Sequence, residues 1–241
     1  MVGIGTVVNA LSIIVGALVG IIIKTGLPKR LKEIIMQAIG LSVIIIGLSG
    51  TLQGIYYVEH QGKLGSEHIM LLIFSLIIGG VWGEIINIEE KLEKMGGWFQ
   101  NRLSQKEGNF AQGFITASLM YCVGAMAIVG ALEDGLAGDP SILFSKSILD
   151  GVTAVIFAAS MGPGVALSAL PVLVYQGGIT LLSGAIKPLL TEIVISQTSL
   201  VGSVLIMAIG LNLLELKRIR VGNLLPAVFI PLFYYVIKLV F

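Results

Sequence analysis

The residues best suited to chemistry are an acid and a base four positions apart in an apolar stretch, Asp150 and Lys146. That spacing places both side chains on one face of an α-helix, where they can pair. A helix that begins near Pro140 carries Asp150 roughly 15 Å along its axis, close to the middle of a ~30 Å hydrocarbon layer. A charge at that depth costs at least ~2.5 kcal/mol on insertion scales. The pair therefore indicates a site for a proton, an ion or a substrate charge, although an ion pair that only positions helices has the same pattern.

Three uncharged polar residues in apolar segments join the predicted binding set: Asn9, Ser168 and Gln176. An amide or hydroxyl group surrounded by lipid needs a hydrogen-bond partner inside the protein. Such groups either link neighbouring helices or line a pathway for a solute. Both interpretations stay open for these three side chains.

Two acids of a glycine-rich stretch, residues 133–139, complete the predicted set: Asp134 and Asp139. The composition of this stretch is typical of a solvated outer turn, and alternatively of a loop that attracts cations to an outer mouth. Asp139 precedes Pro140, and this pair is typical of the residues that open a helix.

The residue types present argue against metal, cofactor and nucleic-acid chemistry. The chain has one cysteine, Cys122, and two histidines, His60 and His68, so metal ligands are scarce. It contains no phosphate-binding loop, HExxH motif or nucleophile elbow. A net charge of +1 provides no electrostatic basis for binding nucleic acid. We therefore expect no enzyme, no cofactor and no metal site.

The elements that must position these side chains are membrane-spanning helices. Hydrophobic residues make up 56% of the 241 positions and charged residues only 12%, against about 25% charged in an average soluble domain. A spanning helix needs about 20 mostly apolar residues. Eight segments meet this requirement: 3–23, 34–54, 68–88, 110–132, 141–161, 164–186, 193–214 and 222–241. We expect an all-α, polytopic integral membrane protein with the lipid bilayer as its main partner.

Basic residues predict the orientation in the membrane. Eight spans place the gaps after the first, third and seventh helices on one side, and these gaps hold 11 of the 15 Lys and Arg residues. Cytoplasmic loops carry the excess of basic residues in membrane proteins. The pattern therefore predicts that this side is cytoplasmic and that both termini lie outside.

The chain is predicted to form one transmembrane domain over residues 1–241. Within it, 1–88 holds the first helix triplet, 110–161 a central helix pair, and 162–241 the second triplet. Between the first two lies 89–109, where apolar residues recur at helical spacing among charges. This pattern favours a helix lying on the cytoplasmic interface of the membrane.

An internal repeat relates the two triplets. Residues 5–34 and 164–193 align without gaps, and Asn9 falls on Ser168. Seven positions are identical: Gly5, Ala10, Leu11, Val15, Leu31, Glu33 and Ile34 match Gly164, Ala169, Leu170, Val174, Leu190, Glu192 and Ile193. Five helices separate the start of the two copies, so the copies run in opposite directions. This predicts an inverted-topology repeat of helices 1–3 and 6–8, the architecture of many secondary transporters, although apolar sequences also align by chance.

Two glycine pairs have the spacing of a helix-packing motif, Gly16/Gly20 and Gly79/Gly83. Glycines four residues apart let two helices approach closely. They indicate tight packing within the chain or, alternatively, a homo-oligomer that forms through these faces.

A block in the middle of the chain resembles a known family. The residues that carry the resemblance are the run 122–130, then Asp134-Gly135-Leu136, Gly138-Asp139, Lys146 to Gly151 and Tyr175-Gln176-Gly177, together with Asn9. They resemble the YdfK/YqgA-like family of bacterial membrane proteins, over essentially the whole chain. The resemblance implies a multi-span protein of the bacterial inner membrane. The family is a domain-of-unknown-function group, so it implies no substrate and no catalytic roles.

These observations favour a small secondary transporter or ion-conducting protein, coupled to H⁺ or Na⁺ through Asp150. Its partner would be a small ion, an amino acid or an organic acid. The alternative is a non-transporting scaffold or regulatory protein that acts through helix packing and the amphipathic segment 89–109. A lipid-modifying enzyme would need a reactive cluster that the sequence does not contain.

Overall fold

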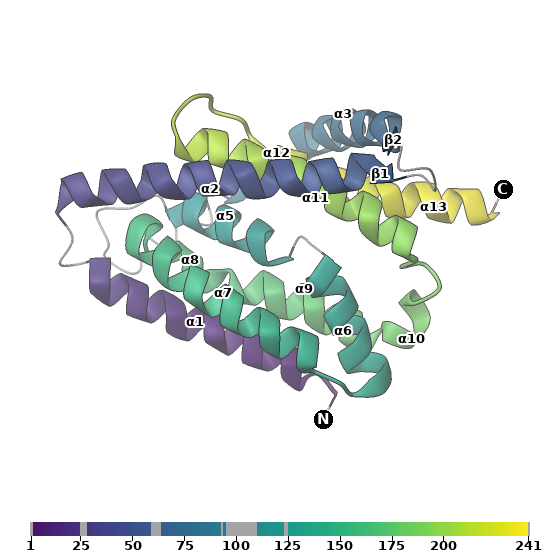
Figure 1. Ribbon diagram of the computed structural model, residues 1–241, viewed down its shortest axis with the longest axis horizontal. Helices are drawn as coiled ribbons and strands as arrows, with labels where there is room; N and C mark the ends of the chain where they lie inside the picture. The colour runs from purple at the N-terminus through teal and green to yellow at the C-terminus, as the bar shows by residue number, and fades with distance from the viewer. Residues whose placement is uncertain are drawn as a thin grey trace. The chain divides into compact units, whose positions relative to one another are not determined.

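The structure, a computed structural model, describes residues 2–24, 28–58, 64–92, 94, 110–122 and 125–240. It confirms an all-α polytopic architecture (Figure 1). In the described residues, seven helices are long and apolar enough to cross a membrane, and α5 with α6 forms an eighth span if this pair, bent by 59°, crosses once. The elements are α1 Ile4–Lys24, α2 Lys29–Ile55, β1 Tyr56–Val58, β2 Leu64–Ser66, α3 Ile69–Ile86, α5 Phe110–Cys122, α6 Ala125–Ala137, α7 Ser141–Met161, α8 Gly164–Leu167, α9 Ala169–Leu181, α10 Ser183–Ile186, α11 Glu192–Leu213, α12 Val221–Leu224, the 3₁₀ helix η1 Leu225–Phe229 and α13 Ile230–Val240.

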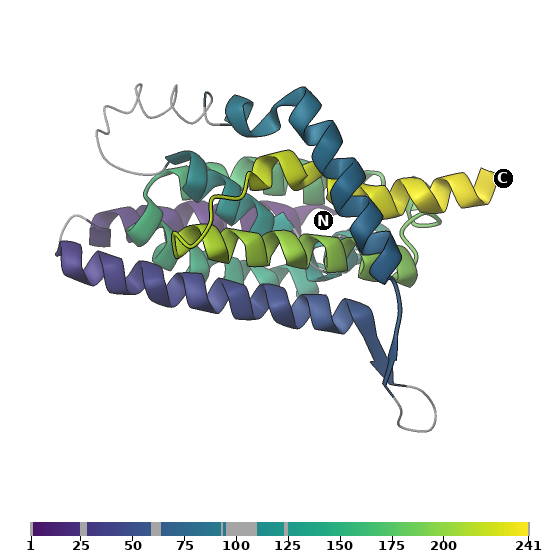
Figure 2. The same cartoon turned by 90° about the horizontal axis from the view of Figure 1, so that it is seen from above.

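A short hairpin between α2 and α3 was not predicted. Strands β1 and β2 pair antiparallel with Tyr56 opposite Ser66, at the end of α2 (Figure 2). Each strand has three residues, too few for an alternating pattern to be recognised in the sequence. His68 follows with a φ of 67° and precedes the first turn of α3. His60 lies outside the described residues.

The predicted interfacial helix is only partly covered. Residues 88–92 and 94 are helical, and the remainder of 89–109 lies outside the described residues. Glu90 and Lys94 form an exposed ion pair one helical turn apart. This agrees with a polar face in the described part.

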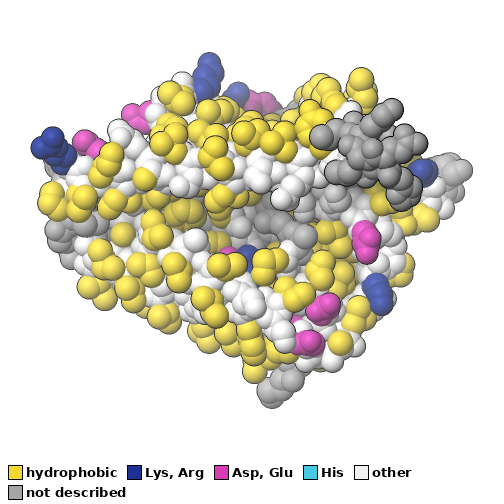
Figure 3. Space-filling view, in the orientation of Figure 1, with side chains coloured by type: hydrophobic (Ala, Val, Ile, Leu, Met, Phe, Trp, Pro, Cys, Tyr) yellow, Lys and Arg dark blue, Asp and Glu magenta, His cyan; other side chains and the backbone are white. Residues whose placement is uncertain are grey.

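Large apolar side chains lie on the outside of the spanning helices. Ile22 is 72% exposed, Ile148 70% and Ile85 77%. Hydrophobic side chains are spread over the face drawn in Figure 3, with few charged side chains among them. A soluble domain rarely exposes so much contiguous apolar surface, so these side chains are placed to contact lipid.

The chain forms two compact units, residues 1–36 with 90–187 and residues 37–89 with 188–241. In the first unit, α1 packs side by side with α7. Gly5 lies against Leu143, Gly16 against Gly151 and Gly20 against Val155. Residue numbers increase in the same direction along both helices at these contacts, so α1 and α7 are parallel.

This parallel packing bears on the number of spans. Successive spans alternate in direction, so two parallel helices need an odd number of crossings between them. Helices α2 and α3 supply two. The bent pair of α5 and α6 supplies the third if it crosses once, and the described helices then make eight spans.

The second unit is built on two antiparallel contacts. Gly47 of α2 packs on Met207 of α11 and Gly54 on Leu200, so the two helices run in opposite directions. Helix α3 is likewise antiparallel to the last span, with Gly79 against Ala227 and Gly83 against Asn223.

Polar bonds close the second contact at one end. The Glu84 carboxylate accepts from Arg220 at 2.6 Å and from the Asn223 amide at 2.7 Å. The Glu89 carboxylate accepts from the backbone N–H of Gly222 at 2.6 Å, at the start of α12. These bonds hold the start of the last span, at α12, against the end of α3.

The two glycine pairs are used inside the chain. Gly16 and Gly20 face carbonyl groups of α7, while Gly79 and Gly83 face the backbone of η1 and α12. All four are buried. These glycines therefore serve close helix packing within the chain, the first of the two uses that their spacing predicts.

The α1–α7 contact gives a direct stability test. A methyl group on Gly16 would overlap the carbonyl oxygen of Gly151, whereas one on Gly178 of α9 would meet no described atom within 4 Å. Gly16→Ala should lower the unfolding free energy by about 1–3 kcal/mol through overpacking. Gly178→Ala should leave it unchanged or raise it by up to ~1 kcal/mol, because alanine favours the helix. Thermal unfolding in detergent measures both, and equal midpoints would mean that α1 and α7 are not in close contact.

Candidate functional site

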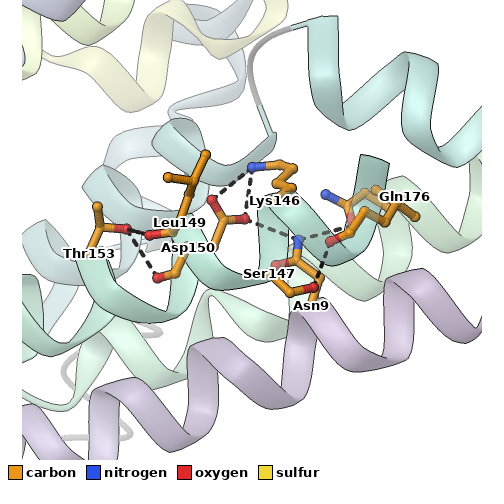
Figure 4. Close-up of polar contacts among 8 residues, drawn as sticks. Asn9, Lys146, Ser147, Leu149, Asp150, Thr153 and Gln176 are labelled. Carbon is orange, nitrogen blue, oxygen red and sulfur yellow. Dashed lines mark hydrogen bonds and ion pairs between the residues drawn. The ribbon is translucent and has the colours of Figure 1, made fainter. Parts of the chain in front are cut away.

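Four of the seven predicted site residues meet in the first unit. Asn9 comes from α1, Lys146 and Asp150 from α7, and Gln176 from α9 (Figure 4). Asn9 and Gln176 are fully buried, and Lys146 and Asp150 are each 5% exposed. Residues up to 167 positions apart in the sequence therefore form one polar cluster, which we call the central cluster.

The ion pair at its centre has bidentate geometry. Lys146 Nζ donates to Asp150 Oδ1 at 2.8 Å and to Oδ2 at 2.7 Å. Asp150 is the tenth residue of the 21-residue helix α7. The pair thus lies midway along a spanning helix, as the sequence predicts. A buried pair of this kind is tolerated because each charge neutralises the other.

A chain of side-chain amides extends the pair toward α9. Asn9 Nδ2 donates to Asp150 Oδ2 at 3.0 Å and to Gln176 Oε1 at 3.2 Å. The other ends of both amides, Asn9 Oδ1 and Gln176 Nε2, are buried and have no hydrogen-bond partner among the described residues. Leaving such a group unsatisfied costs ~1–3 kcal/mol. The chain therefore holds an open acceptor and an open donor next to the ion pair.

Two residues that the sequence analysis did not name border the central cluster. Thr6 lies one turn before Asn9 on α1, beside Gly177, and its hydroxyl has no partner in the described structure. The Tyr121 ring of α5 stacks on Phe157, and its centroid lies 6.0 Å from Lys146 Nζ. Thr6 had a sequence signal, since it is a polar residue three positions from Asn9 on the same helix face. Tyr121 had none beyond its place next to Cys122.

The nearby hydroxyls do not complete the hydrogen bonding of the cluster. Ser147 donates to Leu143 O, and Thr153 donates to carbonyls of its own helix (Figure 4). Such bonds to the preceding turn are usual for serine and threonine inside helices. They leave the open atoms of Asn9 and Gln176 unsatisfied.

Small residues bring α1 and α7 together. Gly16 and Gly151 let α1 approach α7, which puts Asn9 within reach of the Asp150 carboxylate. Glycines permit this because they have no side chain between the two backbones.

The remaining three predicted residues lie elsewhere. Ser168 is buried, but its hydroxyl donates to Val165 O at 2.6 Å within its own segment. It therefore does not join Asn9 in the central cluster. Asp139 is exposed and accepts from the backbone N–H and the hydroxyl of Ser141. These two bonds hold the pKa of Asp139 below its usual value. The N-cap of α7 is Pro140, so Asp139 lies one residue before the cap position predicted for it and bonds the first residue of the helix.

The interpretation of residues 133–139 as a solvated outer turn was wrong for Asp134. Helix α6 continues to Ala137, and Asp134 is fully buried in it. Its carboxylate accepts from the backbone N–H groups of Gly3 and Gly5 at 3.1 and 3.2 Å. An acid at this position satisfies the unpaired N–H groups at the start of α1. Asp134 is thus a link between α6 and the first turn of α1.

Metal coordination has no visible basis in the described ranges. No three His, Cys, Asp or Glu side chains there lie close enough to hold a metal ion. His68 pairs instead with the Gln197 amide of the second unit at 3.2 Å.

The family of the chain follows from comparison with known proteins. Residues 4–236 match the family described as protein of unknown function, DUF554. The chain belongs to this family.

Two curated relatives of the DUF554 chain agree over nearly full length. The uncharacterized membrane protein YdfK of Bacillus subtilis (strain 168) is 34% identical over 227 residues, 94% of this chain and 93% of that protein. The uncharacterized protein YqgA of Escherichia coli (strain K12) is 29% identical over 234 residues, 95% and 94% of the two chains. No solved structure matches. The resemblance found in the sequence is therefore confirmed, and it brings no assigned substrate.

The ion pair predicts a characteristic mutant pattern. Lys146→Gln or Asp150→Asn alone leaves a buried charge unpaired, which typically costs ~3–5 kcal/mol. The double variant removes both charges and should recover most of that loss. Thermal unfolding of the purified variants in detergent measures the three changes. Losses that simply add in the double variant would mean that the two side chains do not interact.

Proposed function

We propose that this DUF554 protein is a small secondary transporter whose solute or coupling ion binds at the central cluster. The observation that carries the proposal is the bidentate Lys146–Asp150 pair midway along α7, in contact with amides that keep open hydrogen-bonding atoms. Ionisable residues inside a membrane are costly and usually serve ion or substrate pathways. Movement of an unmodified solute, without an enzymatic step, is part of the proposal.

The open atoms favour a binding role over a purely structural one. A pair that only positions helices is best served by surroundings in which every polar group is satisfied. Here Asn9 Oδ1, Gln176 Nε2 and the Thr6 hydroxyl are buried without partners in the described structure. Polar groups of this kind are available to a solute or to an ordered water.

The inverted repeat is a second part of the proposal. In the second unit, α2 packs antiparallel on α11 and α3 packs antiparallel on the last span. In the first unit, α1 packs against α9. These contacts pair helices 1, 2 and 3 with 6, 7 and 8, as an inverted repeat would. They support a transporter of the kind that works by rocking one repeat against the other.

We also propose a bacterial inner-membrane location with both termini outside, from the distribution of basic residues. Single cysteines in a Cys122→Ser background test this orientation. Ala137→Cys, at the exposed last residue of α6, should react with a membrane-impermeant maleimide in intact cells. Leu216→Cys, 68% exposed between α11 and α12, should react only after the membrane is opened. The reverse labelling pattern would invert the orientation.

The scaffold alternative makes a different use of the chain. It depends on segment 89–109, of which the structure describes only 89–92 and 94. Its other support, the glycine faces, is used within the chain. The alternative expects deletion of the segment to abolish function and Asp150→Asn to have no effect.

The transporter proposal makes the opposite prediction. Asp150→Asn should reduce solute uptake into proteoliposomes to the level of protein-free vesicles, because the only acid of the central cluster is lost. Glu33→Gln is the matched control, since it removes an exposed carboxylate at the start of α2 and should transport normally. The double variant Lys146→Gln/Asp150→Asn separates function from folding, because it should be stable and still inactive. Normal uptake by folded Asp150→Asn would overturn the proposal.

A further inference from the structure

We infer that the central cluster carries a monovalent anion together with one proton, the proton on Asp150 and the anion against Lys146. This inference rests on the proposed function and names its substrate class. The observations behind it are the charge balance of the ion pair and the two open atoms of the amide chain.

The buried cluster has to keep a net charge of zero. In the resting cluster Lys146 and Asp150 neutralise each other, and both are almost completely buried. A proton on Asp150 alone would leave Lys146 as an uncompensated charge, and an anion on Lys146 alone would leave Asp150 uncompensated. Buried charges of either kind are strongly disfavoured. Proton and anion together restore neutrality, so each promotes the binding of the other.

The amide chain can form hydrogen bonds with both the ionised and the protonated form of Asp150. In the resting state Asn9 Nδ2 donates to the Asp150 carboxylate and to Gln176 Oε1. A protonated Asp150 becomes a donor and needs an acceptor instead. Rotation of both amides by half a turn supplies it, because Asn9 Oδ1 then accepts from Asp150 and from Gln176 Nε2. The two atoms that this reversed chain uses are the two left open in the resting state.

The Lys146 ammonium group provides the binding position for the anion. When Asp150 is protonated, the Lys146 ammonium group loses two bonds to carboxylate oxygens, 2.8 and 2.7 Å long. A small anion can accept those bonds. The centroid of the Tyr121 ring lies 6.0 Å from Lys146 Nζ, so this aromatic ring also borders the ammonium group. Asp150 is the only acid in the cluster, so one negative charge is replaced, which selects a monovalent anion over a dianion.

The neighbouring helices bring few other titratable groups to Asp150. Besides Lys146 on α7, they are Tyr121 and Cys122 on α5, Tyr175 on α9 and Asp134 on α6, while Glu133 of α6 is exposed. Asp134 is engaged with Gly3 and Gly5 at the start of α1. The sequence of α8 and the described side chains of α1 contain no titratable group. The binding step forms one O–H bond on Asp150 from a proton of the water phase, and release breaks it, so no oxidant or further reactant is involved.

The test measures proton entry driven by an anion gradient. Proteoliposomes contain the pH dye pyranine, and valinomycin with equal potassium on both sides holds the membrane potential at zero. Chloride, nitrate and lactate are the monovalent probes, sulfate and succinate the dianions, and glycine a neutral zwitterion. We expect at least one monovalent anion to acidify the lumen above the rate of protein-free vesicles, and to do so equally at an imposed potential. Asp150→Asn and Lys146→Gln should each abolish this flux.

The positioning role of the amides has its own readout. Asn9→Leu keeps both charges but removes both ends of the amide, and it should lower the flux about tenfold or more, as for loss of a hydrogen bond to a charged group. It should also move the pH of half-maximal flux upward. Asn9 bonds the ionised Asp150 carboxylate more strongly than the protonated one, so its loss makes Asp150 easier to protonate. A purely structural role for Asn9 would lower the flux without moving its pH dependence.

The outcomes separate the inference from the proposed function. Three results would overturn the inference but leave the transporter proposal standing. Asp150-dependent uptake could be electrogenic, it could be driven by Na⁺ without proton movement, or it could accept glycine or a dianion in place of monovalent anions. Acidification by a monovalent anion that persists in Asp150→Asn would overturn both. Absence of any Asp150-dependent flux across the panel would overturn the inference, and uptake of an unrelated solute that needs Asp150 would still support the proposed function.

Discussion

The cost of a net charge inside a lipid-bounded helix is the constraint on which this structure depends. Lys146 and Asp150 satisfy it together, since each neutralises the other midway along α7. Asn9 and Gln176 then have to come close, because a carboxylate in that position needs donors from the protein rather than from water. The glycines that let α1 approach α7 follow from the same need. The packing of the first unit is in this sense organised around one ion pair.

Much of the fold could be predicted from the sequence, because lipid imposes a simple requirement of length and apolarity on each span. Asp150 and Lys146 were found in the same way, from helical spacing and depth. The contact of Asn9 with both Asp150 and Gln176 could not be found, since it depends on how three helices distant in sequence pack. Asp134 was misassigned because Gly135 and Gly138 suggested a turn. Gly135 instead lets α6 pack closely on Thr180 and Ser183, and the helix continues past it.

The chain belongs to DUF554 and is similar to YdfK and YqgA over nearly its full length. These similarities leave the role of the central cluster to physical argument. Two features from different parts of the cluster bear on that role, a charge pair that must stay neutral and amides with open ends. Together they describe a site whose hydrogen bonds can accommodate either protonation state of one carboxyl group.

The most direct test is the protonation state of Asp150 itself, followed by infrared difference spectroscopy of the protein in lipid at constant pH. The account predicts that a monovalent anion makes a protonated-carboxyl C=O band appear, because the anion takes over Lys146 and Asp150 accepts a proton. The band should be absent from Asp150→Asn and from Lys146→Gln difference spectra. A carboxyl band of Asp150 already present without any anion, or a spectrum that no monovalent anion changes, would contradict the account.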